Sequence, residues 1–431
     1  KKKLSDIISG VHLKNDYHNM KFIKTLSRLI VGAVFIYSGF VKGIDPLGST
    51  YKFTDYFTAF NLEFLNVLSF PLAIILSSAE FIIGAALLWG LRMKLVSWLA
   101  LIFMAFFTVL TFFLAIFNPV TDCGCFGDAI ILTNWETFWK NLILIIITIP
   151  IFIFRHKYRQ VYKKAGEWSV LAIVLAGFLW VVNYSYRHLP IVDFRPYNVG
   201  THIPSKMVIP EGASADEYET ILYYEKDGVV KEFTEENFPW QDTTWKFVNS
   251  ESVLVKKGYT PPIYNFSITR PNGVDITDNV LQDTTWTFLL ITYKLEDANK
   301  KALEKVNELA LMCNDRNWNF YCLTSSPGDI LEDYKKNLGL VFDFYYTDEI
   351  TLKTIVRSNP GLLLLRKGTI VEKWHHNDLP DASTVSEHLL SDILTKNTNQ
   401  LEKHRVFYLI LFFLLFAALV RIIRQNFDSR K

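Results

Sequence analysis

The chain reads DCGCFGD over residues 122–128, a Cys-Gly-Cys turn between two long apolar runs. The runs cover about residues 95–117 and 138–154, close to the ~20 residues with which a helix crosses a bilayer. Pro119 ends the first run, because proline does not continue a helix. The sequence therefore predicts two thiols at a membrane surface, in the connection between two transmembrane helices.

Similar apolar runs occur elsewhere in the chain, and half of its 431 residues are hydrophobic. The first run is slightly short for a bilayer, so we expect flanking polar residues to complete it. The six predicted spans cover about residues 26–41, 70–91, 95–117, 138–154, 168–184 and 406–423.

The distribution of Lys and Arg predicts the orientation. Basic residues cluster in the N-terminal arm, at 92–94, at 155–164 and in the C-terminal tail, whereas the loop 45–66 carries only Lys52 and residues 118–137 carry none. Basic loops stay on the cytoplasmic side, so the Cys-Gly-Cys turn and residues 189–404 are expected outside. The net charge of +2, with no strongly basic half, argues against a nucleic-acid partner.

The large outer region divides into two parts. Residues 218–224 and 229–233 alternate around a Lys-Asp-Gly turn and predict a β-hairpin. From residue 261 onward predicted strands and helices alternate and end in a hairpin, which indicates an α/β sheet domain.

These boundaries divide the chain into seven predicted segments. They are a cytoplasmic arm (1–24), a four-helix membrane domain (25–157), a fifth transmembrane helix (158–188), an extracytoplasmic β-rich linker segment (189–260), an α/β domain (261–398), a sixth transmembrane helix (404–424) and a cytoplasmic tail (425–431).

The membrane domain resembles the DoxX-type four-helix family in its MauE branch, named for methylamine utilisation. The residues that carry the resemblance are Arg28, Gly32, Gly39, Lys42, Asp45-Pro46, Asn118-Pro119, the string CGCFG at 123–127, Trp135 and Asn141. The resemblance implies a four-helix unit tied to quinone-linked redox chemistry or to disulfide formation in exported proteins. It also implies the inner membrane of a bacterium, a periplasmic outer domain, and membrane lipids, exported or envelope proteins and a larger membrane complex as partners.

The α/β domain resembles the thioredoxin-like fold in its peroxiredoxin-type branch. Ser358-Asn359-Pro360-Gly361 before a strand is similar to the cis-proline loop of that fold, and residues 362–374 to its closing hairpin. The family's Cys-x-x-Cys belongs near residues 295–299, where this chain reads LEDAN. The resemblance therefore implies the fold and peptide docking at Asn359 and Pro360, without thiol catalysis by this domain.

Cys123 and Cys125 admit three interpretations. Thiols two residues apart can close a small, strained and therefore oxidising ring, and Gly124 supplies the backbone freedom for it. Asp122 and Asp128 are expected to raise the pKa of the thiols by like-charge repulsion. A reversible redox pair, a structural bridge and a metal pair all remain open, although a loop without His makes a poor zinc site.

Glu80 lies midway along the second span, where an ionisable side chain usually faces the bundle interior. It is either a quinone or proton site or a buried hydrogen-bond partner. Lys42 pairs with it only if their depths in the membrane agree. Arg28, at the inner end of the first span, is either a further cofactor contact or an anchor that reaches the interface.

Three further side chains have mainly structural interpretations. Cys313 and Cys322 are small core residues or, in an oxidising compartment, a disulfide. His375, followed by another His, is expected at a solvated strand end.

The sequence thus predicts a polytopic α-helical membrane protein, a DoxX/MauE-like four-helix bundle plus two further spans, with an extracytoplasmic α/β thioredoxin-like domain. Its first function hypothesis is a redox protein in which Cys123 and Cys125 exchange electrons between exported thiols and a membrane acceptor such as quinone, with no metal. The second is a non-enzymatic scaffold or assembly subunit that presents a thiol-less domain to partner proteins. A transporter ranks lower because the spans show no inverted repeat.

Overall fold

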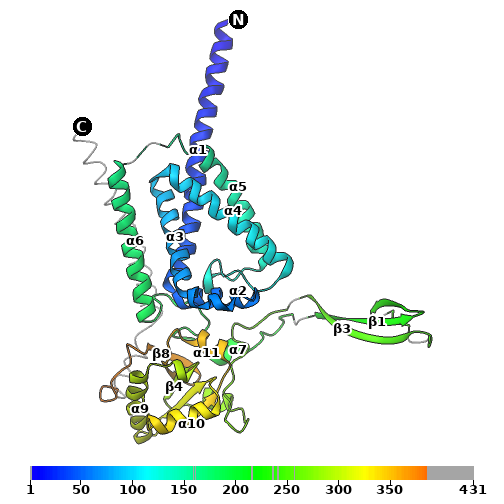
Figure 1. Ribbon diagram of the computed structural model, residues 1–431, viewed down its shortest axis with the longest axis vertical. Helices are drawn as coiled ribbons and strands as arrows, with labels where there is room; N and C mark the ends of the chain where they lie inside the picture. The colour runs from blue at the N-terminus through cyan, green and yellow to red at the C-terminus, as the bar shows by residue number, and fades with distance from the viewer. Residues whose placement is uncertain are drawn as a thin grey trace.

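The protein consists of a helical bundle, an α/β domain below one end of it, and a β-sheet arm that projects sideways (Figure 1). The computed structural model describes residues 2–158, 160, 162–214, 217–234, 237–239, 242–256 and 258–385, with side chains from Phe22 onward except at 218 and 253–256. The predicted sixth transmembrane helix and the cytoplasmic tail lie outside the described residues.

Within these residues, five helices are long and apolar enough to cross a membrane. They are residues 22–44 of α1 (Lys2–Ile44), α3 (Ser69–Trp89) with the turn η1 (Glu63–Leu68) before it, α4 (Met93–Phe117), α5 (Asn134–Ile153) and α6 (Lys164–Arg187). The apolar part of α1 is 23 residues long, so the expectation of a short first span was wrong. The helix begins far upstream, and Phe22 and Ile23 extend its apolar length.

Two glycines allow a close contact between α1 and α3. A Cβ on Gly39 would lie 2.6 Å from the backbone nitrogen of Phe81, and one on Gly84 would lie 2.6 Å from that of Ile36. Small residues allow helices to approach this closely in a membrane, so α1 and α3 pack backbone against backbone.

The loop expected at 45–66 contains a helix, α2 (Pro46–Ala59), which runs across the end of the bundle (Figure 1). The Asp45 side chain accepts a hydrogen bond from Gly48 N at 2.9 Å, and Pro46 occupies the first helical position. Both are favourable helix starts.

The α/β domain contains a five-stranded sheet in the order β6-β5-β4-β7-β8. The strands are β4 (Thr287–Thr292), β5 (Asn319–Thr324), β6 (Phe344–Tyr346), β7 (Gly361–Arg366) and β8 (Thr369–His375). β4, β5 and β6 are parallel, β7 is antiparallel to β4, and β8 is antiparallel to β7. This topology, with the Asn359–Pro360 bond in cis before β7, is the predicted thioredoxin-like fold.

Helices cover both faces of the sheet. α9 (Lys300–Asp315) and α10 (Gly328–Asn337) contribute to the core cluster on one face. α7 (Ile203–Met207), α8 (Thr277–Gln282) and α11 (Glu349–Ile355) contribute to the cluster on the other. Figure 1 shows α7 and α11 between the sheet and the bundle.

The first part of the predicted linker segment packs on the α/β domain. Gly200 N donates to Ile370 O at 2.7 Å, and Lys373 of β8 donates to the Asp193 carboxylate at 2.9 Å. Tyr197 and Ile203 are buried in its core.

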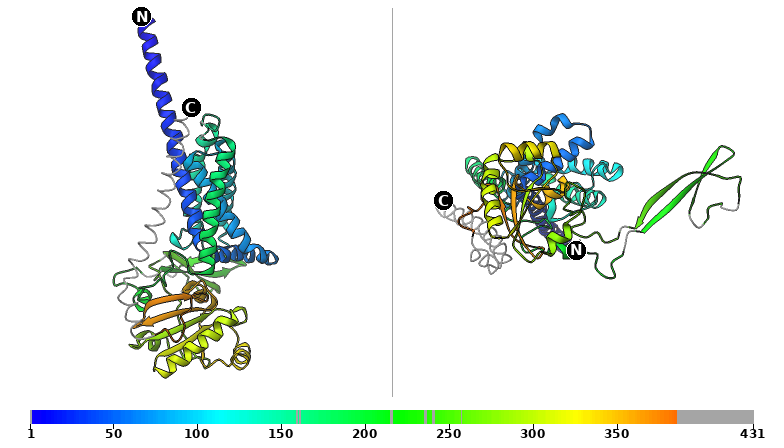
Figure 2. Two further views of the ribbon diagram at one scale, coloured as in Figure 1. Left: turned by 90° about the vertical axis from the view of Figure 1, so that its left-hand side faces the viewer. Right: turned by 90° about the horizontal axis from the view of Figure 1, so that it is seen from below.

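The arm contains the predicted hairpin, β1 (Glu217–Lys226) and β2 (Val229–Thr234), and a third strand, β3 (Lys246–Lys256), on the other side of β1. In the view from below, the arm extends away from the rest of the molecule (Figure 2).

Candidate functional site

Helix α2 holds the Cys-Gly-Cys turn from one side. Lys52 Nζ donates to the Asp122 carboxylate at 2.7 Å, and Asp122 in turn accepts from Gly124 N at 2.9 Å. Tyr56 Oη donates to the carbonyl oxygen of Cys123 at 3.0 Å. Gly124 has a positive φ of 65°, which glycine adopts without strain. The turn is therefore fixed at three points by side chains and local backbone.

The two thiols are free and adjacent, with Cys123 Sγ 3.1 Å from Cys125 Sγ. The contact with Cys123 lowers the pKa of Cys125 to about 6, and the positive charges of Lys140 and Lys42 act in the same direction. The same contact, together with burial, raises the pKa of Cys123. The pair therefore consists of one readily ionised and one protonated sulfur, a suitable starting point for disulfide exchange.

The expected repulsion from the neighbouring carboxylates was wrong for this geometry. Asp122 forms an ion pair with Lys52, and Asp128 forms one with Arg357 at 2.9 Å. Both negative charges are matched by cations, and neither carboxylate is a leading cause of the pKa shift of Cys125.

A large apolar cavity of about 790 Å³ lies on the membrane side of the turn. Cys123 and Cys125 line it together with apolar side chains of α2, α3 and α4. Its lining includes Ile75, Ile102 and Phe106, which are 62%, 58% and 61% exposed on transmembrane helices and therefore face lipid.

A second, much smaller cavity of about 30 Å³ is lined by Cys125, Ser38, Glu80, Lys140 and Asn141, among others. Lys42 Nζ donates to both oxygens of Glu80 at 2.7 Å, so their depths in the membrane do agree. Lys42 also donates to Ser38 Oγ at 3.0 Å, which donates to the carbonyl oxygen of Cys125 at 2.8 Å. A chain of polar contacts thus links the buried ion pair to the turn.

Arg28 is not part of this group. Its guanidinium carbon lies 5.9 Å from the centre of the Tyr158 ring, which follows the far end of α5. Asn141 donates to Thr111 Oγ1 at 3.2 Å and so connects α5 to α4.

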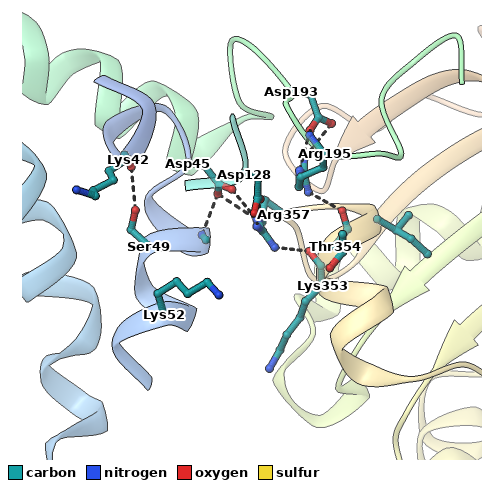
Figure 3. Close-up of polar contacts among 12 residues, drawn as sticks. Lys42, Asp45, Ser49, Lys52, Asp128, Asp193, Arg195, Lys353, Thr354 and Arg357 are labelled. Carbon is teal, nitrogen blue, oxygen red and sulfur yellow. Dashed lines mark hydrogen bonds and ion pairs between the residues drawn. The ribbon is translucent and has the colours of Figure 1, made fainter. Parts of the chain in front are cut away.

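The outer side of the turn faces the α/β domain across a pocket of about 240 Å³, lined in part by Gly124, Gly127 and Asp128. Arg357 joins the two parts of the protein (Figure 3). Its guanidinium donates to both oxygens of Asp45, at 3.0 and 2.9 Å, and to Asp128 at 2.9 Å. We call this set of three residues the Arg357 clamp.

Arg357 of the clamp immediately precedes the cis-proline loop in the chain. Asn359 Nδ2 donates to Lys294 O at 2.7 Å, and Asn359 O accepts from Asn299 N at 3.1 Å. The segment 295–299, where the fold's thiols were expected, therefore lies against the loop. Its Leu295 is fully buried, with its amide donating to Ser326 Oγ at 2.8 Å.

The remaining candidates are structural. Cys313 and Cys322 are free and fully buried in one core cluster, where burial raises the pKa of both, that of Cys313 to about 12. His375 is 2% exposed, so the expected solvated strand end was wrong, and burial lowers its pKa to about 3. In the described part of the chain, no three His, Cys, Asp or Glu side chains are grouped so as to hold a metal ion.

The sequence did not single out Tyr56, Lys140 or Arg357 as site residues. The only local signal was the position of Lys140 near the start of a span, two residues before an apolar run. Tyr56 and Arg357 lie in segments whose composition is unremarkable for a loop and a helix end.

Comparisons with known proteins match two parts of the chain. Residues 20–154 match the family model of the methylamine utilisation protein MauE, which confirms the predicted resemblance of the membrane domain. Residues 218–257, which contain the arm, match a domain of unknown function, DUF8463. Comparison with curated proteins gives no match.

Among solved structures, the chain is similar to a candidate protein disulfide isomerase from Bacteroides thetaiotaomicron. The two are 14% identical, with a TM-score of 0.25, over 32% of this chain and 91% of that one.

The protein is thus a multi-pass membrane protein in contact with lipid, with a MauE-like membrane domain and a thioredoxin-like domain. This combination fits a redox-associated role at the membrane.

Proposed function

We propose that Cys123 and Cys125 exchange electrons between thiols of exported proteins and a lipid-soluble acceptor of the quinone class. The observation that carries the proposal is the position of the turn between two environments. Its thiols line the 790 Å³ apolar cavity, and its glycines line the 240 Å³ pocket between the bundle and the α/β domain, which charged side chains such as Asp45 and Arg357 also line.

The residues of the large cavity suit a quinone. Its volume is within the range of small-molecule sites, and its lining is predominantly apolar with polar groups near one end. Lys42, Ser49, Lys52 and Tyr56 supply these polar groups and would hold the ring oxygens, and the apolar side chains would hold an isoprenoid tail. Arg28 lines neither cavity, so we leave it out of the proposed site.

The chemistry of the pair is thiol–disulfide exchange. An exported dithiol reduces the Cys123–Cys125 disulfide and leaves as a disulfide, so two electrons and two protons pass to the pair. Closing the Cys123–Cys125 bond again releases the two electrons and the two protons. A quinone takes up two electrons and two protons when bound. The buried Lys42–Glu80 pair, linked to the turn through Ser38, is suited to accept and return a proton near Cys125.

We further propose that the protein lies in a bacterial inner membrane with the turn and the α/β domain in the periplasm, where disulfides persist. The basic loops support this orientation. Protease added to spheroplasts should cleave the Trp374 region and spare the link at residues 92–94. Cleavage at 92–94 with protection of Trp374 would reverse the orientation.

In this proposal the α/β domain recruits clients and performs no thiol chemistry. Asn359 and Pro360 form its docking loop, and the Arg357 clamp holds that loop next to the turn.

A second function, a scaffold or assembly subunit without redox activity, is favoured by one observation. The α/β domain has no Cys-x-x-Cys. In its LEDAN segment at residues 295–299, Leu295 lies where a thiol was expected, and the backbone amides of Leu295 and Asn299 already donate hydrogen bonds.

Thiol trapping of the full-length protein in lipid nanodiscs separates the two functions. We would use a Cys313→Ala/Cys322→Ala background, a reduced dithiol peptide, and nanodiscs with or without a quinone. The redox proposal expects the pair to cycle, with peptide oxidation that requires quinone and is lost in Cys123→Ser and Cys125→Ser. A pair that stays oxidised in every condition, with a stability loss as the only effect of either variant, would support a structural bridge in a scaffold.

A further inference from the structure

The two thiols of the turn occupy different surroundings. Of the two cavities beside the turn, Cys123 lines the large apolar one, whereas Cys125 lines both that cavity and the 30 Å³ cavity. The small cavity exceeds the ~10–15 Å³ that one water needs, and its polar side chains offer hydrogen bonds. Cys125 thus lies between the large apolar cavity and a small, mainly apolar cavity that also contains charged and amide side chains.

The charges that face Cys125 come from several elements. Lys42 of α1 is matched by Glu80 of α3, with both carboxylate oxygens at 2.7 Å. Cys123 and Tyr56 approach from the turn and from α2. The two ions of the Lys42–Glu80 pair cancel, and the Cys123 thiol and the Tyr56 phenol are neutral when protonated. These four groups together therefore carry no net charge.

Lys140 of α5 is the exception. Within the described residues it has no carboxylate partner, and its ammonium lies 4.3 Å from the centre of the ring of Phe126, the residue that follows Cys125. Lys140 also lines the small cavity with Cys125. A cation held on an aromatic face beside a thiol, without an anion of its own, favours negative charge on that sulfur.

We propose that Lys140 is a positioning residue that holds Cys125 as the thiolate of the pair, while Cys123 keeps its proton. The depressed pKa of Cys125 and the raised pKa of Cys123 agree with this assignment.

The assignment gives the two sulfurs separate roles, and this step rests on the proposed function. A client thiolate attacks Cys123 Sγ, the Cys123–Cys125 bond breaks, and Cys125 leaves as the thiolate beside Lys140. The second client thiol then attacks the client–Cys123 disulfide, which oxidises the client and releases Cys123 to take up a proton. A thiol of lower pKa is the better leaving group, so exchange through Cys123 is favoured.

The test measures ionisation directly and needs no quinone. The reduced full-length protein, with Cys313→Ala/Cys322→Ala, is alkylated in nanodiscs with iodoacetamide over a pH series, and mass spectrometry follows each thiol. Cys125 should react with a midpoint near pH 6, and Cys123 only at much higher pH. Lys140→Met should raise the midpoint of Cys125 by about one pH unit or more. Lys140→Arg should keep the low midpoint of Cys125, because the positive charge remains.

The matched control is Lys157→Met, which removes a cation 5.1 Å from the centre of the Phe154 ring, beyond the far end of α5 from the turn. It should leave the midpoint of Cys125 in place. An unchanged midpoint in Lys140→Met, or a Cys123 that ionises first, would overturn the proposal. Lys140→Gln serves if Lys140→Met does not fold.

The outcomes are separable from those of the proposed function. If Cys125 ionises first in a Lys140-dependent manner but no quinone-dependent oxidation occurs, the assignment stands and the proposed function fails. If oxidation occurs and both thiols ionise together, the assignment fails alone.

Discussion

Replacing Arg357 with Ala should release the α/β domain from the membrane domain. The guanidinium makes three of its hydrogen bonds to two carboxylates of the membrane domain and is 7% exposed. The pKa of Arg357 is raised by the Asp45 and Asp128 carboxylates, although burial alone would lower it. The charge is therefore stabilised mainly by residues of the other domain.

The magnitude follows from burial. Removing one partner of a buried ion pair costs ~3–5 kcal/mol. Asp45 and Asp128 are 19% and 38% exposed, so water partly compensates both freed carboxylates and Asp128 contributes the smaller share. We expect a loss of about 2–3 kcal/mol in docking free energy, which is a roughly 30- to 150-fold shift toward the undocked state.

Hydrogen–deuterium exchange of the full-length protein in nanodiscs measures this shift. Arg357→Ala should raise exchange in peptides from α2, from the turn at 122–128 and from residues 349–360. Peptides from β4 and β5 should keep their protection. Arg357→Lys should give an intermediate effect, because one ammonium does not span two carboxylates as a guanidinium does.

Arg366→Ala is the matched control. Arg366 is an exposed residue of the same domain, with its guanidinium 4.8 Å from the Trp286 ring and away from the clamp. Unchanged exchange in α2 and the turn of Arg357→Ala would refute the reasoning. A rise throughout β4–β8 would show instead that Arg357 stabilises the domain itself.

Three further predictions concern buried groups. As pH falls from about 6.5 toward 3, His375 binds a proton in the unfolded α/β domain but not when it is buried in the folded domain. The free energy of unfolding of the domain should therefore fall by up to ~1.4 kcal/mol per pH unit. Denaturant titrations should find this slope reduced in His375→Phe. Gly39→Ala should lower the stability of the bundle by ~1–3 kcal/mol in thermal melts, because its methyl group meets the α3 backbone, whereas Gly177→Ala, with nothing within 4 Å, should not. Cys313→Ala/Cys322→Ala should cost ~1 kcal/mol per site in denaturant titrations and leave the redox state of the turn unchanged; altered trapping of the turn would contradict their assignment to the core.

The sequence predicted the membrane spans because each is a continuous apolar run, and it predicted the α/β domain because strands and helices alternate there. It missed α2, since residues 46–59 mix aromatic, polar and charged side chains without a clear period. An interfacial helix needs no such period when one side faces lipid headgroups and the other faces protein.

Site contacts between distant parts of the chain were harder to foresee. Lys42 and Glu80 meet because Gly39 lets two helices cross closely, a distance that spacing in the sequence does not encode. Arg357 is 312 residues from Asp45, and nothing local marks either as the partner of the other. Asp128 was therefore expected to repel the thiols, whereas its charge is paired with Arg357.

The exposed apolar lining of the 790 Å³ cavity, at Ile75 and Ile102, has a consequence for how its ligand is supplied. An apolar molecule leaves water for hydrocarbon, so it reaches such an opening by lateral diffusion within the bilayer. Occupancy then follows the molar ratio of ligand to lipid, and the volume of the surrounding water has no influence. A weak affinity of the cavity for the ligand is sufficient under these conditions, because partitioning into the bilayer already raises the local ligand concentration. Doubling the lipid at constant ligand should therefore lower occupancy as effectively as halving the ligand.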